Sequence, residues 1–128
     1  LNVNTDGLNY QQYKPFSLTQ IVLGPFCGNL PHKYEYDERF FFKSDYDFCL
    51  QVMKGEQKVL RINKYAYYCD HGRAKGGSVA MRTLDRELEC ARLIMKKWGS
   101  QIIRYNVNNP KGYAEVLNGQ VHIPLHGV

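Results

Sequence analysis

The sequence of 128 residues contains no CxxC pair, no long apolar run and no block of like charges, and each absence excludes a class of protein. Its four cysteines lie about twenty residues apart, whereas a zinc site or a redox motif needs close pairs. Their neighbours are apolar, so we expect buried, reduced thiols at Cys27, Cys49, Cys69 and Cys90. Without an apolar run that could span a bilayer, we expect a cytoplasmic protein with no signal peptide and no membrane partner.

The residues that are present predict one compact domain, 1–128, with a mildly basic surface. Hydrophobic residues make up 44% of the chain, including 10 Tyr, 6 Phe and 1 Trp, which is enough for one modest core. A net charge of +5 suits an anionic partner such as a nucleotide phosphate or a nucleic acid, and it equally suits an ordinary solvated surface. Residues 1–16 are polar and are expected to be irregular. The chain starts at Leu1 rather than Met, which favours a segment of a longer protein.

Apolar spacing predicts two helices. The first covers 45–53, with Ser44 or Asp45 as its N-cap and Gly55 directly after its end. The second covers about 83–98 and ends at Gly99. Its apolar stripe is predicted to pack in the core, and consists of Leu84, Leu88, Ala91, Met95 and Trp98.

Short strands are predicted where β-branched and aromatic residues gather. The segments are 17–23, 58–69, 101–107, 113–117 and 120–123. Asn118-Gly119 indicates a type I′ hairpin turn between the last two. The order of these elements predicts an α/β or α+β fold with a small β-rich C-terminal tail.

The stretch from Tyr36 to Phe48 contains the residues best suited to chemistry. Four acids, Asp37, Glu38, Asp45 and Asp47, flank an aromatic run. The last two open the first predicted helix, where the positive end of the helix dipole stabilises a carboxylate by about 0.3–1 kcal/mol. Local composition alone favours a helix cap at Asp45 and a solvated first-turn acid at Asp47; a general base at this position is the other interpretation.

The order of motifs resembles the acceptor-side signature of inverting GT-A glycosyltransferases. The segments that match are Tyr36-Asp37-Glu38-Arg39-Phe40-Phe41, Ser44-Asp45-Tyr46-Asp47-Phe48, Gly55, Val59-Leu60-Arg61-Ile62, His71 and Gly76-Gly77-Ser78. Within that family, the amino-acid sequence of 43–51 and 60–66 is most similar to the TET-associated glycosyltransferase group, whose members are found in phages and beside base-oxidising enzymes. The resemblance implies a fragment of a GT-A-like mixed sheet flanked by helices, forming the C-terminal part of a transferase.

The same resemblance implies a nucleotide-sugar-dependent hexosyltransferase that modifies hydroxymethylated pyrimidines in DNA. Asp45 takes the place of the general base that deprotonates the acceptor hydroxyl. Asp47, Asp37 and Glu38 are expected to support the acceptor or the helix start. His71 takes the place of a ligand to the manganese or magnesium ion, and Arg73 and Lys75 are expected to contact phosphates. For these three residues an ordinary place in a solvated loop remains an equal alternative.

Two departures from the family pattern leave other functions open. Ser44 stands where the family has Glu, and no strand is followed by the Asp-x-Asp motif that binds the donor. We therefore expect the donor-binding half of the transferase in cis or in trans.

The sequence leaves two other functions open. One is a non-catalytic nucleic-acid-binding or interaction module, in which the basic strand 58–64 and Tyr65, Tyr67 and Tyr68 contact phosphates and stack on bases. The other is a metal-dependent nuclease built on Asp47, Glu56 and Lys58, although its Glu and Lys are predicted in a turn, where the motif needs a strand.

Overall fold

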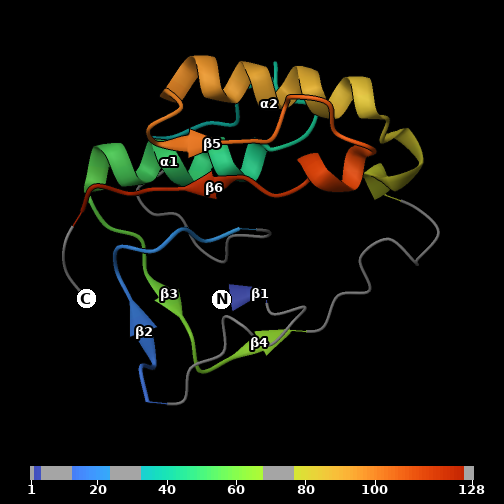
Figure 1. Cartoon of the computed structure of the whole chain (residues 1–128). Helices are drawn as coiled ribbons and strands as arrows, with labels where there is room; N and C mark the ends of the chain where they lie inside the picture. The colour runs from blue at the N-terminus through green and yellow to red at the C-terminus, as the bar shows by residue number, and fades with distance from the viewer. Residues whose placement is uncertain (1, 4–12, 24–32, 68–76, 126–128) are drawn as a thin grey trace. The chain divides into compact units, whose positions relative to one another are not determined.

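The computed structural model describes residues 2–3, 13–23, 33–67 and 77–125 (Figure 1). Its contacts divide the chain into two compact units. Unit 1 comprises residues 1–36, 45–74 and 125–128, and unit 2 comprises residues 37–44 and 75–124. The single domain expected from chain length stays a prediction. Two α-helices and several two-residue strands agree with the α+β class, and no helix in the described ranges is long and apolar enough to cross a membrane.

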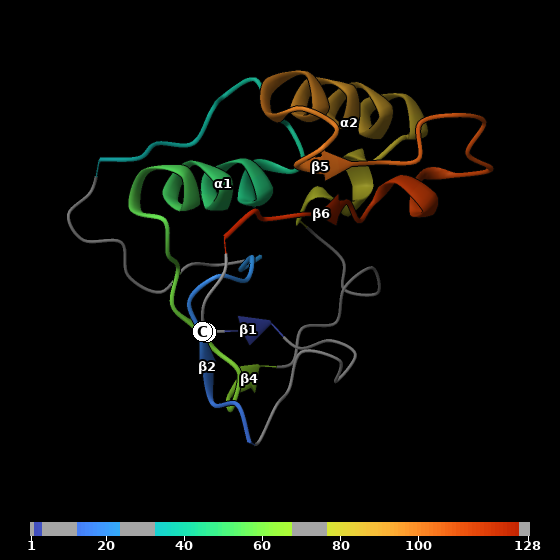
Figure 2. The ribbon, with the colours of Figure 1, turned by 60° about the vertical axis from the view of Figure 1, so that its left-hand side comes forward.

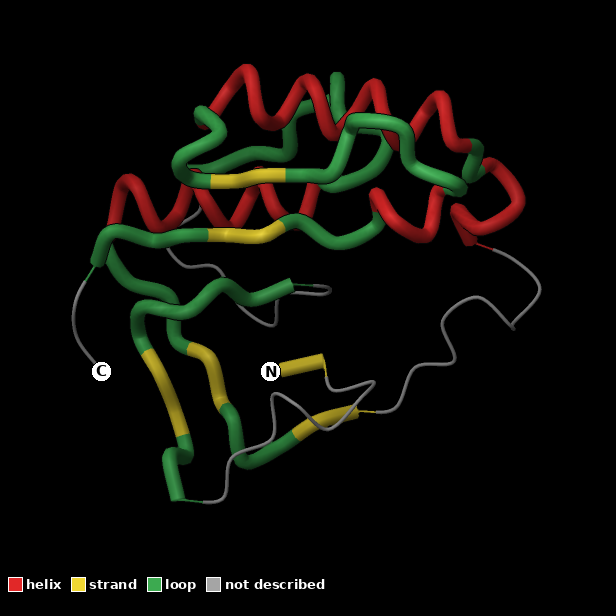
Figure 3. Tube along the Cα trace, in the orientation of Figure 1, coloured by secondary structure: helices red, strands yellow, loops and turns green. Residues whose placement is uncertain are grey.

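Unit 1 combines helix α1 (Ser44–Glu56), which begins at the junction with unit 2, with two pairs of very short strands (Figure 3). β1 (Asn2–Val3) pairs in parallel with β4 (Ala66–Tyr67). β2 (Phe16–Ser17) pairs antiparallel with β3 (Arg61–Ile62). The strands expected at 17–23 and 58–69 are therefore present only as these short segments, because the chain bends after Ser17 and again after Ile62.

Helix α1 is longer than predicted, and Gly55 lies inside it instead of after it. The glycine is explained by a close approach: a Cβ on Gly55 would lie 1.8 Å from the hydroxyl oxygen of Tyr34. The left-handed backbone expected at Gly55 is found two residues later, at Gln57, whose φ is 56°. The buried side of α1 forms much of the core of unit 1, through Tyr46, Phe48, Cys49, Leu50 and Met53.

The second predicted helix is confirmed in unit 2 as α2 (Leu84–Trp98). Thr83 is its N-cap and accepts a hydrogen bond from the backbone N–H of Arg86. Gly99 ends it with φ of 87°, and its N–H donates to the carbonyl oxygen of Met95. The predicted apolar stripe was placed wrongly: of its members only Ala91 is buried, and the buried face is made by Glu87, Cys90, Ala91 and Ile94.

The loop before α1 lies on α2 through alternating aromatic and charged contacts. The Lys97 ammonium lies 5.4 Å from the ring centre of Phe40, and the guanidinium of Arg82 lies 4.6 Å from that of Phe42. Arg86 covers Phe41 at 5.3 Å. The aromatic run of the sequence thus contacts two cations of α2 and Arg82, which precedes that helix, and each such pair contributes about 0.5–1 kcal/mol at an exposed site.

The C-terminal part of unit 2 differs from the predicted hairpin. β5 (Ile103–Arg104) lies beside α2 and pairs antiparallel with β6 (Gln120–Val121) (Figure 2). The segment expected as a strand at 113–117 forms the 3₁₀ helix η2 (Tyr113–Val116), which packs on α2. This turn buries Val116 completely and presents two backbone carbonyls to the ammonium group of Lys43. A second 3₁₀ helix, η1 (Gly77–Met81), leads into α2.

The expectation of buried, reduced cysteines is confirmed where the structure describes them. Cys49 in unit 1 and Cys90 in unit 2 are both buried and free. Cys27 and Cys69 lie outside the described residues.

Candidate active site at the start of helix α1

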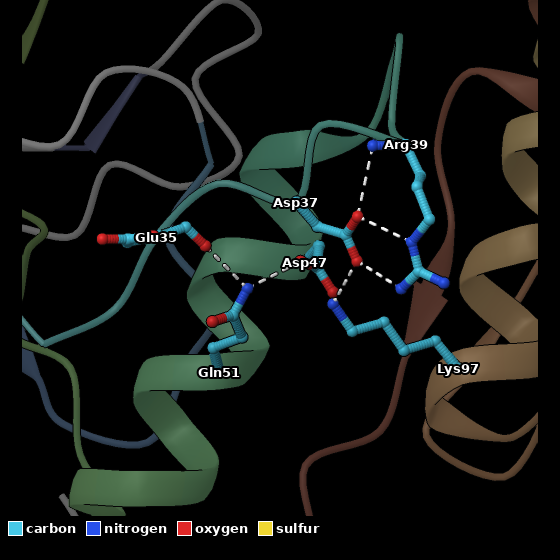
Figure 4. A network of polar contacts seen from close by, with 6 residues as sticks. All are labelled: Glu35, Asp37, Arg39, Asp47, Gln51 and Lys97. Atoms are coloured by element: carbon cyan, nitrogen blue, oxygen red, sulfur yellow. Dashed lines mark hydrogen bonds and ion pairs between the residues drawn. The ribbon is translucent and has the colours of Figure 1, made fainter.

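Two carboxylates occupy the first turn of α1, and their surroundings differ. Asp47 is fully buried, and its carboxylate accepts a 2.8 Å hydrogen bond from the side-chain amide of Gln51, one turn further along (Figure 4). The same amide donates to the backbone carbonyl of Glu35 at 3.0 Å. Asp47 therefore connects α1 to the segment that precedes the aromatic run, and it is closed to solvent.

Asp45 is only half-buried. One of its carboxylate oxygens accepts a hydrogen bond from the backbone N–H of Tyr46 at 2.9 Å. The helix begins at Ser44, so both residues considered as N-caps lie within the first turn, after Lys43 with its φ of 66°. Of the two acids at this helix start, Asp45 is the one that is accessible to solvent.

Cys49 lies one turn after Asp45, and its thiol is unreactive. Burial raises the pKa of its thiol to about 11, and the nearby charge of Asp45 acts in the same direction. A hydrogen bond of 3.3 Å from the backbone N–H of Val22 to the sulfur opposes that rise without cancelling it. The group is therefore a neutral thiol at physiological pH and not a nucleophile.

The other two acids of the stretch belong to unit 2. Asp37 receives two side-chain hydrogen bonds from Arg39, at 2.8 and 2.6 Å, and one from Lys97 at 2.8 Å (Figure 4). The Arg39 guanidinium, followed by the Lys97 ammonium, holds the pKa of Asp37 well below its usual range. Asp37 thus fixes the loop to the end of α2, whereas Glu38 is exposed to solvent.

Three predicted site residues, His71, Arg73 and Lys75, lie outside the described residues. Within residues 2–3, 13–23, 33–67 and 77–125, no group of three or more His, Cys, Asp and Glu side chains is placed to hold a metal ion. The described residues therefore do not supply a set of ligands for manganese or magnesium.

The structure does not bring together the carboxylates of Asp47 and Glu56, which the nuclease motif requires. Glu56 is the last residue of α1, about 13 Å along the helix axis from Asp47 at the usual rise per residue. Its carboxylate is engaged by Lys33 at 2.5 Å and by the hydroxyl of Tyr34 at 2.8 Å, and the Lys33 contact lowers the pKa of Glu56. Two-metal sites hold their ions about 3.5–4 Å apart, which carboxylates so far apart cannot arrange.

A buried charge cluster in unit 2 was missed by sequence reasoning. The ammonium of Lys43 donates to the carboxylate of Glu87 at 2.7 Å and to the carbonyl oxygen of Val116 at 2.7 Å, and it lies 4.5 Å from the ring centre of Tyr105. Arg82 pairs with the other oxygen of Glu87. Burial lowers the pKa of Lys43, and the pairing with Glu87 opposes that shift. No local signal marks this pair, because 44 residues separate Lys43 from Glu87.

Comparisons with known protein families, with curated proteins and with solved structures found no match. The described elements define a small chain of the α+β class with two carboxylates at one helix start.

Proposed function

We propose that this chain is the acceptor-side part of a nucleotide-sugar-dependent glycosyltransferase with a GT-A-like fold, in which Asp45 is the general base. The observation that supports this role is the contrast within the first turn of α1. Asp45 is partly open to solvent, whereas Asp47 is buried and bonded to Gln51. A carboxylate at the positive end of a helix keeps its charge and can accept a proton from an acceptor hydroxyl.

In the proposed reaction, Asp45 takes the hydroxyl proton while the acceptor oxygen forms a bond to the anomeric carbon. The bond from that carbon to the nucleotide diphosphate breaks, and the diphosphate leaves with the electron pair. Asp47 holds the helix start that positions Asp45, by means of its bond to Gln51. The acceptor proposed from the sequence resemblance is a hydroxymethylated pyrimidine in DNA.

Donor binding requires residues beyond those that the structure describes. Because the described residues offer no ligand set for manganese or magnesium, we assign no step to a metal ion. We propose that the nucleotide sugar is held by a donor-binding half in cis or in trans, together with His71, Arg73 and Lys75.

Replacing Asp45 with Asn tests the base directly. With the donor-binding half present, we expect Asp45→Asn to lower kcat for sugar transfer to hydroxymethylated DNA by about 100-fold or more, since general bases contribute about 10²–10⁴-fold. Product is measured by mass spectrometry of digested DNA. Asp85→Asn is the matched control, because Asp85 is an exposed acid in the first turn of α2.

An Asp45→Asn enzyme that transfers sugar at the rate of the Asp85→Asn control would refute the assignment of the base. If the complete protein neither transfers nor hydrolyses nucleotide sugars with manganese or magnesium, the chain is instead a non-catalytic module on a transferase-like scaffold.

A further inference from the structure

The pairing of β2 with β3 separates polar residues that face inward from residues that face solvent. Phe16 lies opposite Ile62, and Ser17 lies opposite Arg61. Because successive side chains of a strand point to opposite faces, Phe16 and Ile62 share one face, and Ser17 and Arg61 share the other. Ser17 and Arg61 are buried, whereas 45% of the surface of Phe16 is exposed. The solvent-facing side is the one available to a partner.

The polar side chains of the inward face form hydrogen bonds within unit 1. Arg61 donates from Nε to the side-chain oxygen of Asn63 at 2.8 Å, and its guanidinium also bonds to Gln20. Asn63 in turn donates to the backbone carbonyl of Lys14 at 3.0 Å. These bonds fix the backbone at Lys14 relative to β3. The basic strand suggested by the sequence therefore turns Arg61 inward and leaves its lysines outside.

We name the exposed residues at this strand pair and its ends the outer patch, which consists of Lys14, Phe16, Leu60, Lys64 and Tyr65. Leu60 is 58% exposed and Tyr65 is 61% exposed, so both offer apolar or aromatic surface to a partner. Both lysines of the patch are exposed. Residues 13–23 and 57–67, which contain the whole patch, include no Asp or Glu.

Charge and shape together point to one occupant. Two lysines without an acidic neighbour in their own segments attract a polyanion. Exposed aromatic rings beside them offer flat surfaces on which unpaired bases stack, whereas the bases of a duplex are already stacked on each other. An acidic peptide would satisfy the lysines and would leave the rings without planar partners. Lys58 is also exposed but follows the acid Glu56 by two residues, so it is not included.

We infer that the outer patch binds single-stranded nucleic acid, with Lys14 and Lys64 on phosphates and Phe16 and Tyr65 stacked on bases. This binding does not depend on sugar transfer. Asp45→Asn leaves it unchanged, so a failure of the proposed function and a failure of this inference give different results.

The test measures the fluorescence anisotropy of labelled oligothymidylate and oligouridylate of about 16 nucleotides, the upper end of single-strand site sizes. We expect Phe16→Leu and Tyr65→Leu each to weaken binding by about ten-fold, because leucine keeps apolar bulk and removes the ring. Tyr65→Phe keeps wild-type affinity. Lys14→Gln combined with Lys64→Gln reduces the salt dependence, the slope of log K against log salt, by about 1.4, at about 0.7 for each phosphate contact.

The matched controls lie on unit 2. Lys96→Gln combined with Lys111→Gln makes the same change in net charge at two exposed lysines, and Tyr113→Leu removes an exposed ring. We expect all three control substitutions to leave affinity and salt slope as in the wild type. Tighter binding to the DNA or to the RNA oligomer identifies which strand the patch prefers, and either supports the inference.

Three results would overturn the inference: no binding at low salt, equal losses in the patch and control variants, or a duplex of equal length that binds as tightly as the single strand. Affinity retained in Phe16→Leu and Tyr65→Leu would also overturn it, because that result describes a general apolar surface for a protein partner. Circular dichroism of each variant excludes unfolding as the cause.

Discussion

A single buried ammonium group, that of Lys43, joins three parts of unit 2. It belongs to the loop 37–43, donates to the carboxylate of Glu87 in α2 and donates to the carbonyl oxygen of Val116 in η2. Both side chains of the ion pair are almost completely buried, with 2% and 0% exposed. Removing Lys43 takes away one of the two cations that pair with the buried carboxylate of Glu87, and a buried charge that loses such a partner is costly.

We therefore expect Lys43→Met to lower the free energy of unfolding by about 3–5 kcal/mol, measured by urea denaturation followed by circular dichroism. Adding Glu87→Leu should recover part of that loss, because the double variant no longer buries an acid opposite an apolar side chain. Lys96→Met, at an exposed position of α2, is the control and should change stability by less than about 0.5 kcal/mol. A Lys43→Met protein as stable as this control would show that the pair contributes nothing.

Asp37 makes the stability of unit 2 depend on pH. Its folded-state pKa lies below the unfolded value, so its contribution to stability is present above the unfolded pKa and is lost as the pH falls through the folded one. We expect Asp37→Asn to be less stable than the wild type at pH 7, with the gap narrowing as the pH falls below about 4, near the ordinary pKa of Asp. Thermal unfolding across this range measures the gap. If the gap stays constant down to the lowest pH, the ion pairs with Arg39 and Lys97 are not its source.

At the scale of elements, the sequence predicted the limits of α2, which depend mainly on neighbouring residues. Thr83 and Gly99 marked the limits of α2 to within a residue, because a cap and a left-handed glycine act on their own neighbours. Asp45 and Asp47 were correctly predicted at the start of α1, whereas the N-cap predicted at Ser44 or Asp45 was wrong, because both residues lie inside the helix. Burial of Glu87 and of Asp47 was not predictable, because each depends on a partner or a packing surface that the spacing of apolar residues does not reveal.

The prediction of a strand at 113–117 failed for a different reason. Val116 and Tyr113 are good strand formers, yet they form a 3₁₀ turn whose carbonyls are needed by Lys43, far away in the sequence. β-propensity measures how a side chain fits its surroundings more than an intrinsic backbone preference, so tertiary contacts override it easily.

Gly99 and Gly112 allow a paired test of the backbone conformation at the end of α2. The backbone at Gly99, with φ of 87° and ψ of 143°, is close to a region that only glycine adopts easily, so we expect Gly99→Ala to cost about 1–3 kcal/mol in urea denaturation. Gly112 has extended backbone and open space around its Cα, so Gly112→Ala should be neutral or slightly stabilising. Equal effects of the two substitutions would mean that the conformation of Gly99 is not required.

At the scale of the whole molecule, the chain passes from one unit to the other after residues 36, 44, 74 and 124. Unit 2 is therefore built from two separate segments, and its short segment contains Lys43 and the aromatic run. Chain length and composition could not predict this division, since they limit only how much core the chain can bury.

The short segment should be indispensable for unit 2. We expect fragment 75–124 alone to unfold without cooperativity in urea, because Glu87 loses Lys43 and Arg82 loses the ring of Phe42. The same fragment with residues 37–44 joined to its N-terminus by a Gly/Ser linker should regain helix content and a cooperative transition, measured by circular dichroism. A linked segment in which Lys43 is replaced by Met is the control and should regain less. Cooperative unfolding of fragment 75–124 by itself would contradict this expectation.

The two buried thiols give each unit its own kinetic reporter. Cys49 is closed within unit 1 and Cys90 within unit 2, so an alkylating reagent reaches either sulfur only when that unit opens. Peptide mapping after short exposures would then give two separate opening rates for one chain. Equal rates would mean that the units open together, and unequal rates would reveal which part of the molecule is released first.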